Sequence, residues 1–205
     1  MGWWRDLMGP GQEEIWRQFA EQVGGRFTDG GWFGQDRVDA QWQQWTLTLD
    51  YYVAHHGKSS TKYTRMRAPY VSRDGFRFKV YRASVFTPMG KALGMVQDHE
   101  IGHERFDENF VVQGPDEARV RRMLRNEKIR ALIEEQPDIS FEVKDDEGYF
   151  GKTFPGGVDE LYFQAHGEIR DLDQLRRLYD LFIEVLDYLC TAGHAHREDP
   201  RIELK

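Results

Sequence analysis

Two histidines and a glutamate occur together in His99-Glu100-Ile101-Gly102-His103, which has the spacing HExxH. On a helix, two histidines four residues apart share a face and can bind one zinc ion, while the glutamate activates a metal-bound water as general base. On this interpretation His99 and His103 are metal ligands and Glu100 is the catalytic base. The third ligand would come from one of three other residues, Glu127, Glu134 or His166. The motif therefore predicts a zinc-dependent, peptidase-like hydrolase as one candidate function.

The residues around HExxH argue against that function. Glu104-Arg105 follow the second histidine, where zinc peptidases continue an apolar helix. The extension that supplies a third histidine needs glycine at position 106 and histidine at 109, but the chain has Phe106 and Asn109. Gly102 in the centre of a helix would cost about 1 kcal/mol relative to alanine. We therefore rank the zinc enzyme second, and the first interpretation assigns no catalytic residue, metal ligand or cofactor.

Charged residues form two blocks of opposite sign. Residues 62–82 contain seven Lys or Arg against one Asp, a net charge of +6, and residues 98–117 contain seven Asp or Glu against one Arg, a net charge of −6. The blocks could pair within the fold or across a homodimer, as most charge runs are solvated or compensated. Alternatively, the basic strands could bind an anion. Four cations are the predicted ligand-binding residues: Arg65, Arg67, Arg77 and Lys79.

Composition narrows the class of protein and of partner. The chain has 205 residues with 28 Lys or Arg and 35 Asp or Glu, and this net charge of −7 argues against nucleic acid as the partner. No apolar run is long enough for a transmembrane helix, and the first residues carry no recognisable targeting segment, so we expect a soluble cytoplasmic protein. The single cysteine, Cys190, excludes a disulfide framework. The expected partner is a protein or an anionic ligand, and not a membrane.

Hydrophobic periodicity predicts the elements that must position these residues. Apolar residues at helical spacing indicate a helix over 11–23, a central pair over about 116–124 and 126–136, and a long helix from Asp171 or Asp173 to Ala192. Alternation predicts strands at 45–53, 62–70, 76–80, 106–112, 139–143 and 158–169. Because strands come in runs, we predict one α+β domain over 1–205, with a mainly antiparallel sheet of about seven strands and the long helix packed on it.

Local signals add details to this prediction. Asp74-Gly75 is typical of a hairpin turn, and Pro69 predicts an edge or a bend at the end of its strand. All six tryptophans precede residue 46, which indicates either a binding surface or anchors between the first helix and the sheet; the positions of Trp16 and Trp45 favour packing.

The remaining histidines and the cysteine can be interpreted as structural or surface residues as well as functional ones. His55-His56 and His194-x-His196 could be metal-binding pairs, but both lie in predicted polar segments, where exposed histidine is common. Cys190 lies next to Leu189 on the predicted last helix, which favours a place in or near the core over a nucleophilic role.

The segment that contains His103 also resembles a family. Ile101-Gly102, three residues later Phe106-Asp107, and then Phe110 form a pattern that is similar to one shared by uncharacterised bacterial proteins with a domain of unknown function. The general layout of residues 60–190 is also similar. The resemblance implies a turn before a short strand, and a structural role in that turn for His103. It implies no known activity, so our first hypothesis is a non-catalytic binding or assembly module with a basic strand patch.

Overall fold

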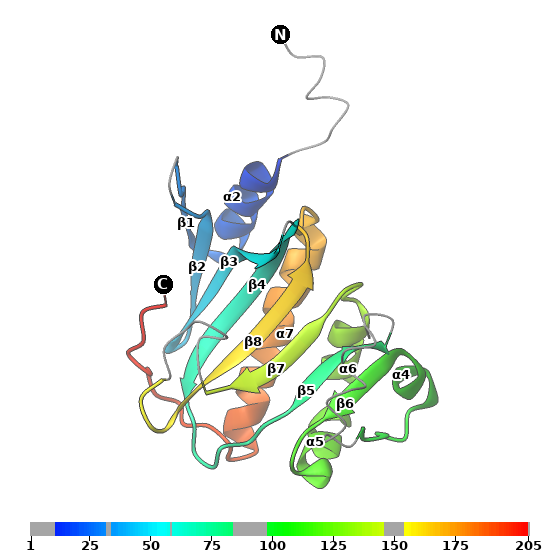
Figure 1. The fold of residues 1–205 in the computed structure, drawn as a ribbon. Helices are drawn as coiled ribbons and strands as arrows, with labels where there is room; N and C mark the ends of the chain where they lie inside the picture. The colour runs from blue at the N-terminus through cyan, green and yellow to red at the C-terminus, as the bar shows by residue number, and fades with distance from the viewer. Residues whose placement is uncertain (1–10, 32–33, 58, 84–97, 146–153, 205) are drawn as a thin grey trace.

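The computed structural model describes residues 11–31, 34–57, 59–83, 98–145 and 154–204. Its strands form one antiparallel sheet in the order β1-β2-β3-β4-β8-β7-β5-β6 (Figure 1). The strands are β1 (Arg26–Thr28), β2 (Arg37–Trp42), β3 (Trp45–His56), β4 (Ser59–Val71), β5 (Lys79–Arg82), β6 (Phe110–Gln113), β7 (Ser140–Lys144) and β8 (Val158–His166). The predicted α+β class is confirmed, with eight strands where the sequence predicted about seven.

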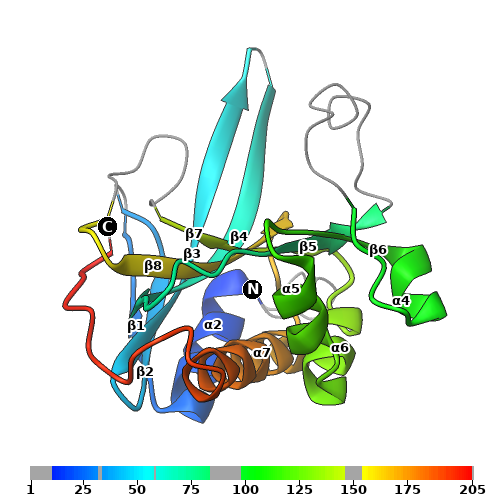
Figure 2. The same cartoon turned by 90° about the horizontal axis from the view of Figure 1, so that it is seen from below.

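Most of the described helices pack on one face of this sheet, and one lies beside its edge strand (Figure 2). The described helices are α2 (Gln12–Val23), α4 (Glu104–Asn109), α5 (Glu117–Leu124), α6 (Glu127–Glu134) and α7 (Leu172–Thr191). Figure 2 shows α2, α5, α6 and α7 together below the sheet, with no described helix on the opposite side. We call that opposite side, which faces the viewer in Figure 1, the open face.

Large apolar side chains join the helices to the sheet. The predicted stripe on α7 is buried in the core: Leu175, Leu178, Phe182, Val185 and Leu189. Phe182 packs on Phe141 of β7 with ring centroids 5.5 Å apart. Trp16 of α2 and Trp45 of β3 have no exposed surface, so the prediction that they act as packing anchors is confirmed. Trp3, Trp4 and Trp32 lie outside the described residues.

Capping residues fix the ends of several helices at the positions that the sequence predicted. Gly24 ends α2 with a φ of 65°, a conformation that glycine adopts without strain. Asn126 caps α6 by accepting from the backbone N–H groups of Lys128 and Ile129, and Asp171 caps α7. The central helix pair and the long helix therefore begin within a residue or two of their predicted starts.

Two predictions about local structure were wrong. Residues 104–109 form helix α4, and only the end of the predicted strand 106–112 belongs to β6. Asp74-Gly75 forms a turn, but β4 pairs with β3 and β8 and does not pair with β5. Phe76 and Phe78 alternate after this turn because both are buried in the connection between β4 and β5. Strand β5 itself pairs with β6 and β7, away from β4 in the sheet.

Strands β3 and β4 extend beyond their neighbours. Pairing of β3 with β2 ends at Leu49, and the strand pairing of β4 with β8 begins at Thr64. Between these points residues 51–56 pair with 59–64 as a two-stranded ribbon, which projects from the plane of the sheet on its open side (Figure 2). We call residues 51–63 the β3–β4 ribbon.

Candidate functional site

The HExxH segment lies outside any helix. Residues 98–103 form an irregular stretch before α4, so the helical geometry on which the zinc prediction depends is absent. The ring of His99 is nearly buried, with its Nε2 atom 2.7 Å from the carbonyl oxygen of Gly114 and its Nδ1 3.6 Å from Glu117. His103 is exposed and precedes the first turn of α4. Among the described residues, no group of three His, Cys, Asp or Glu could hold a metal ion.

A carboxylate explains the spacing of the pattern around His103. Asp107 accepts the backbone N–H groups of Ile101, Gly102 and His103 at 2.9–3.0 Å. Gly102 has a φ of 81°, and Phe106 stacks on Phe110 at 4.5 Å between ring centroids. The pattern therefore builds a turn with an aromatic anchor, which gives the segment a structural role.

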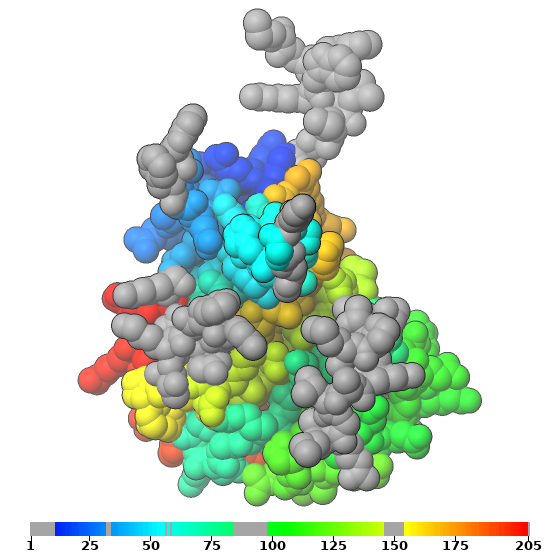
Figure 3. Space-filling view, viewed as in Figure 1, coloured from blue at the N-terminus to red at the C-terminus, as the bar shows by residue number. Residues whose placement is uncertain are grey.

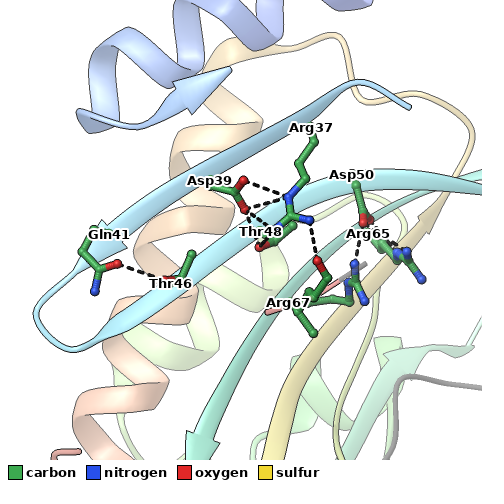
Figure 4. Close-up of polar contacts among 9 residues, drawn as sticks. Arg37, Asp39, Gln41, Thr46, Thr48, Asp50, Arg65 and Arg67 are labelled. Atoms are coloured by element: carbon green, nitrogen blue, oxygen red, sulfur yellow. Dashed lines mark hydrogen bonds and ion pairs between the residues drawn. The ribbon is translucent and has the colours of Figure 1, made fainter. Parts of the chain in front are cut away.

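The open face instead gathers charged side chains around shared carboxylates. Asp50 on β3 is only 3% exposed and binds two arginines of β4 (Figure 4). Arg65 donates to both carboxylate oxygens, at 2.5 and 3.0 Å, and Arg67 donates to Oδ2 at 2.6 Å. Burial disfavours the charged form of Arg65, but its bonds to Asp50 outweigh that effect and raise its pKa. This group therefore contains two cations and one anion.

A second group on the same face has the same composition. Glu142 on β7 lies 3.4 Å from the Nζ atom of Lys79 on β5 and 3.4 Å from that of Lys144. Lys79 is the more accessible cation, with 41% of its side chain exposed, and Lys144 lies over the ring of Tyr162 at 3.5 Å. Each of these two carboxylates on the open face is thus shared by two cations.

A third carboxyl group on the open face is that of Glu160, two residues before Tyr162 on β8. Glu160 on β8 has no exposed surface, and neither of its carboxyl oxygens has a hydrogen-bond partner in the described structure. Burial raises its pKa to about 8, against the opposing charges of Arg67, Arg65 and Lys144. A carboxyl group with this pKa is mostly protonated at neutral pH, so it does not neutralise the cations around it.

Tyrosine and glutamine side chains complete the surface between the two groups. Tyr162 is opposite Arg67 on one side and Glu142 on the other. The hydroxyls of Tyr52 and Tyr162 both donate to Oε1 of Gln164, at 2.8 and 3.0 Å. Burial raises the pKa values of both tyrosines, so they remain hydrogen-bond donors at physiological pH. These contacts hold the charged side chains in fixed rows across the sheet.

The structure brings together three of the four predicted ligand-binding cations. Arg65, Arg67 and Lys79 lie on the open face. Arg67 has no exposed surface, and it binds Asp50 from a buried position. Arg77 lies apart from them and donates to both carboxylate oxygens of Asp159, at 2.6 and 2.7 Å. This pair borders a cavity of about 360 Å³, which is also lined by residues 154–158. Among the described residues, no ion pair joins the basic block 62–82 to the acidic block 98–117.

Two of the other candidate residues, His194 and Cys190, have structural roles. His194 is buried, stacks on Phe76 at 4.5 Å between ring centroids, and lies 2.9 Å from Asp74 through Nδ1. Cys190 packs against the core as predicted, and burial raises the pKa of its thiol, which disfavours a nucleophilic thiolate. The side chain of His55 is exposed at the far end of the ribbon.

Sequence reasoning missed most of the open-face residues. Asp50, Glu142, Lys144 and Glu160 belong to strands that were predicted or lie at their ends, yet no motif singles them out. The available signal was the alternation in β8, where Glu160, Tyr162 and Gln164 alternate with apolar residues. It marks the outward face of one strand but does not say which strands lie beside it.

Comparison with known proteins gives no relative to guide the assignment. No protein-family model, curated protein or solved structure matches this chain. Among the described residues, no helix is long and apolar enough to cross a membrane. The function is therefore inferred from the geometry of the site.

Proposed function

We propose that this protein is a binding module whose open sheet face holds a ligand with at least two anionic groups, carboxylate or phosphate. The observation that carries the proposal is the sharing of each carboxylate by two cations, Asp50 by Arg65 and Arg67, and Glu142 by Lys79 and Lys144. Around Glu142, two cations, Lys79 and Lys144, share the one carboxylate.

The accessible cations define where the anionic groups would bind. Arg65, Lys144 and Lys79 retain exposed side-chain surface, from 14% for Arg65 to 41% for Lys79. They lie on β4, β7 and β5, and neighbouring strands are about 4.8 Å apart, so the cations span about 10–14 Å across the sheet. Lys79 and Lys144 lie on adjacent strands around Glu142, and this pair suits a compact ligand that carries two anionic groups.

The fixed carboxylates and tyrosines support binding without chemistry. Asp50 and Glu142 hold the cations in place before a ligand arrives, which lowers the entropic cost of ordering them. Tyr52 and Tyr162 keep their protons, and Gln164 orients both hydroxyls. Figure 3 shows this face, with the tip of the β3–β4 ribbon pointing toward the viewer.

Titration calorimetry with citrate and with pyrophosphate tests the proposal. The double variant Lys79→Gln/Lys144→Gln removes both lysines that share Glu142, and we expect it to weaken binding about tenfold or more, because each exposed charge contact contributes up to about 1 kcal/mol. A preference for citrate would assign carboxylate ligands, and a preference for pyrophosphate would assign phosphates.

A matched variant separates a site from general electrostatic attraction. Arg122→Gln/Lys128→Gln makes the same change of net charge at exposed positions of α5 and α6, on the other side of the sheet. We expect this variant to bind like the wild type. Equal weakening by both double variants, or no binding of either probe at about 10 mM, would overturn the proposal.

A further inference from the structure

We propose that the β3–β4 ribbon is the interface of a homodimer, in which the outer edge of β3 over residues 50–56 pairs antiparallel with the same edge of a second copy. The interface includes Asp50 and Tyr52 of the anion-binding face, but its midpoint, Val53, lies on the opposite side of β3 from those two side chains, so each proposal can be tested without the other.

The outer edge of β3 has no strand partner over these residues in the described structure. Strand β2 ends its pairing at Leu49, seven residues before the end of β3. A ribbon of only two strands is marginally stable, and its unpaired N–H and C=O groups form a template for another strand. Pairing with a second ribbon would make a four-stranded sheet and satisfy those groups.

Beyond Asp50, the residues of this edge lack the features that protect a free edge. Positions 51–55 are Tyr, Tyr, Val, Ala and His, with no proline, lysine, arginine or carboxylate. Natural edge strands usually carry such residues to prevent pairing with other chains. The neighbouring strand differs, because β4 carries Lys62 and a run of hydroxyl residues, and it also bonds to Gly167 through Thr64 and Lys62.

The one large apolar side chain that is exposed among the described residues lies at the centre of this segment. Val53 is 40% exposed. It lies two residues after Tyr51 and on the same side of β3, and the ring of Tyr51 contacts Trp16 of α2. In a segment of residues 50–56, position 53 is the midpoint. A two-fold axis through an antiparallel pair places the midpoint residue opposite itself, so Val53 would contact the partner subunit's Val53.

The flanking residues are also self-complementary about this axis. Tyr52 would lie opposite the partner subunit's Ala54, a large side chain beside a small one, and Tyr51 would lie opposite the partner subunit's His55. No like charges would face each other between positions 51 and 55. These features fit a second copy of this chain, because the segment can pair with itself antiparallel without bringing like charges opposite each other.

Analytical ultracentrifugation of the full chain tests the interface. We expect a dimer for the wild type and a monomer for Val53→Lys, because two lysines would meet at the axis. Ser60→Lys is the matched control: it adds the same charge to the same ribbon, but on β4, opposite His55 within the subunit. We expect Ser60→Lys to remain a dimer, and circular dichroism would verify that both variants are folded.

A cross-linking experiment then locates the axis. In a Cys190→Ser background, Val53→Cys would place two thiols opposite each other, at the Cα separation of about 4.5–5.5 Å that antiparallel pairs and disulfides share. We expect a covalent dimer on oxidation with oxidised glutathione, and much less with Ser60→Cys. A monomeric wild type at about 100 μM, a dimer that Val53→Lys leaves intact, or equal cross-linking at both positions would overturn the proposal.

Discussion

The two faces of the sheet use alternate residues of the same strands in different ways. In β8, Leu161, Phe163 and Ala165 point to the helices and are buried among apolar side chains, whereas Glu160, Tyr162 and Gln164 point to the open face. The helix-covered face is stabilised by removal of apolar surface from water, and the open face by hydrogen bonds and ion pairs between fixed partners. The comparison shows that burial alone does not distinguish a core from a site, because Glu160 and Phe163 are both fully buried.

The largest expected effect is on the helix-covered face. Phe163→Ala removes a fully buried ring of β8 and leaves a cavity, and we expect the free energy of unfolding to fall by about 3–5 kcal/mol. Urea denaturation at neutral pH measures this change. Gln164→Ala, the next residue on the opposite face, should cost far less, and similar losses in both variants would contradict the distinction between the faces.

A smaller effect of opposite sign is expected for Glu160→Gln. The pKa of Glu160 is about 8 in the folded protein against an ordinary value of 4.5, so the folded chain holds a proton that the unfolded chain releases. That stabilisation is fully present below about pH 4.5 and is lost as the pH rises through about 8. We therefore expect Glu160→Gln to be more stable than the wild type at pH 8.5, by on the order of 2–4 kcal/mol, and similar to it at pH 4.5.

Denaturant unfolding of both proteins at several pH values measures this difference. The stability of the variant should depend less on pH than that of the wild type between about pH 5 and 8. A constant difference between the two proteins across this range would show that Glu160 does not carry the proton. Glu135→Gln, at an exposed position at the end of α6, serves as the control and should leave the pH profile unchanged.

The smallest effect on stability is expected at the accessible cations of the open face. Lys144→Gln removes a cation over the ring of Tyr162 and one of two partners of Glu142, at a partly exposed position. We expect a loss of no more than about 1 kcal/mol in the free energy of unfolding. Thermal unfolding at low and high salt measures it, and a loss above about 2 kcal/mol would make Lys144 a structural residue instead of a binding residue.

Much of the fold could be predicted from local patterns. The stripe on α7, the alternation in β3 and the caps at Asn126 and Asp171 depend on residues close together in the sequence, and the structure has each of them. The turn at Asp74-Gly75 was assigned to a hairpin wrongly, because strand pairing is decided by contacts between distant segments. The segment 106–112 was misassigned because Phe106 and Phe110 are spaced for one face of a short helix, and Asp107 caps the turn before it.

The candidate site was predictable only in part. Positive charge on residues 62–82 drew attention to Arg65 and Lys79, and the structure places both on the open face; their predicted role in ligand binding stays a prediction. Arg77 was grouped with them by its position in the sequence, yet the chain turns between β4 and β5 and directs its side chain to Asp159. The carboxylates that bind these cations come from β3, β7 and β8, and nothing in the local sequence identifies them as partners.

By itself the sequence determined the class of fold, the helices α2, α5, α6 and α7 with their caps, and the core-facing side of strands such as β3 and β8, because periodicity and capping act over a few residues. Tertiary structure alone decided that β8 inserts between β4 and β7, which brings Glu160 and Tyr162 to the two groups of shared carboxylates. It also decided that β3 extends beyond the end of its pairing with β2, which leaves Val53 on an edge without a described strand partner. Strand order and strand length relative to a neighbour are properties of distant segments, so no local pattern encodes them.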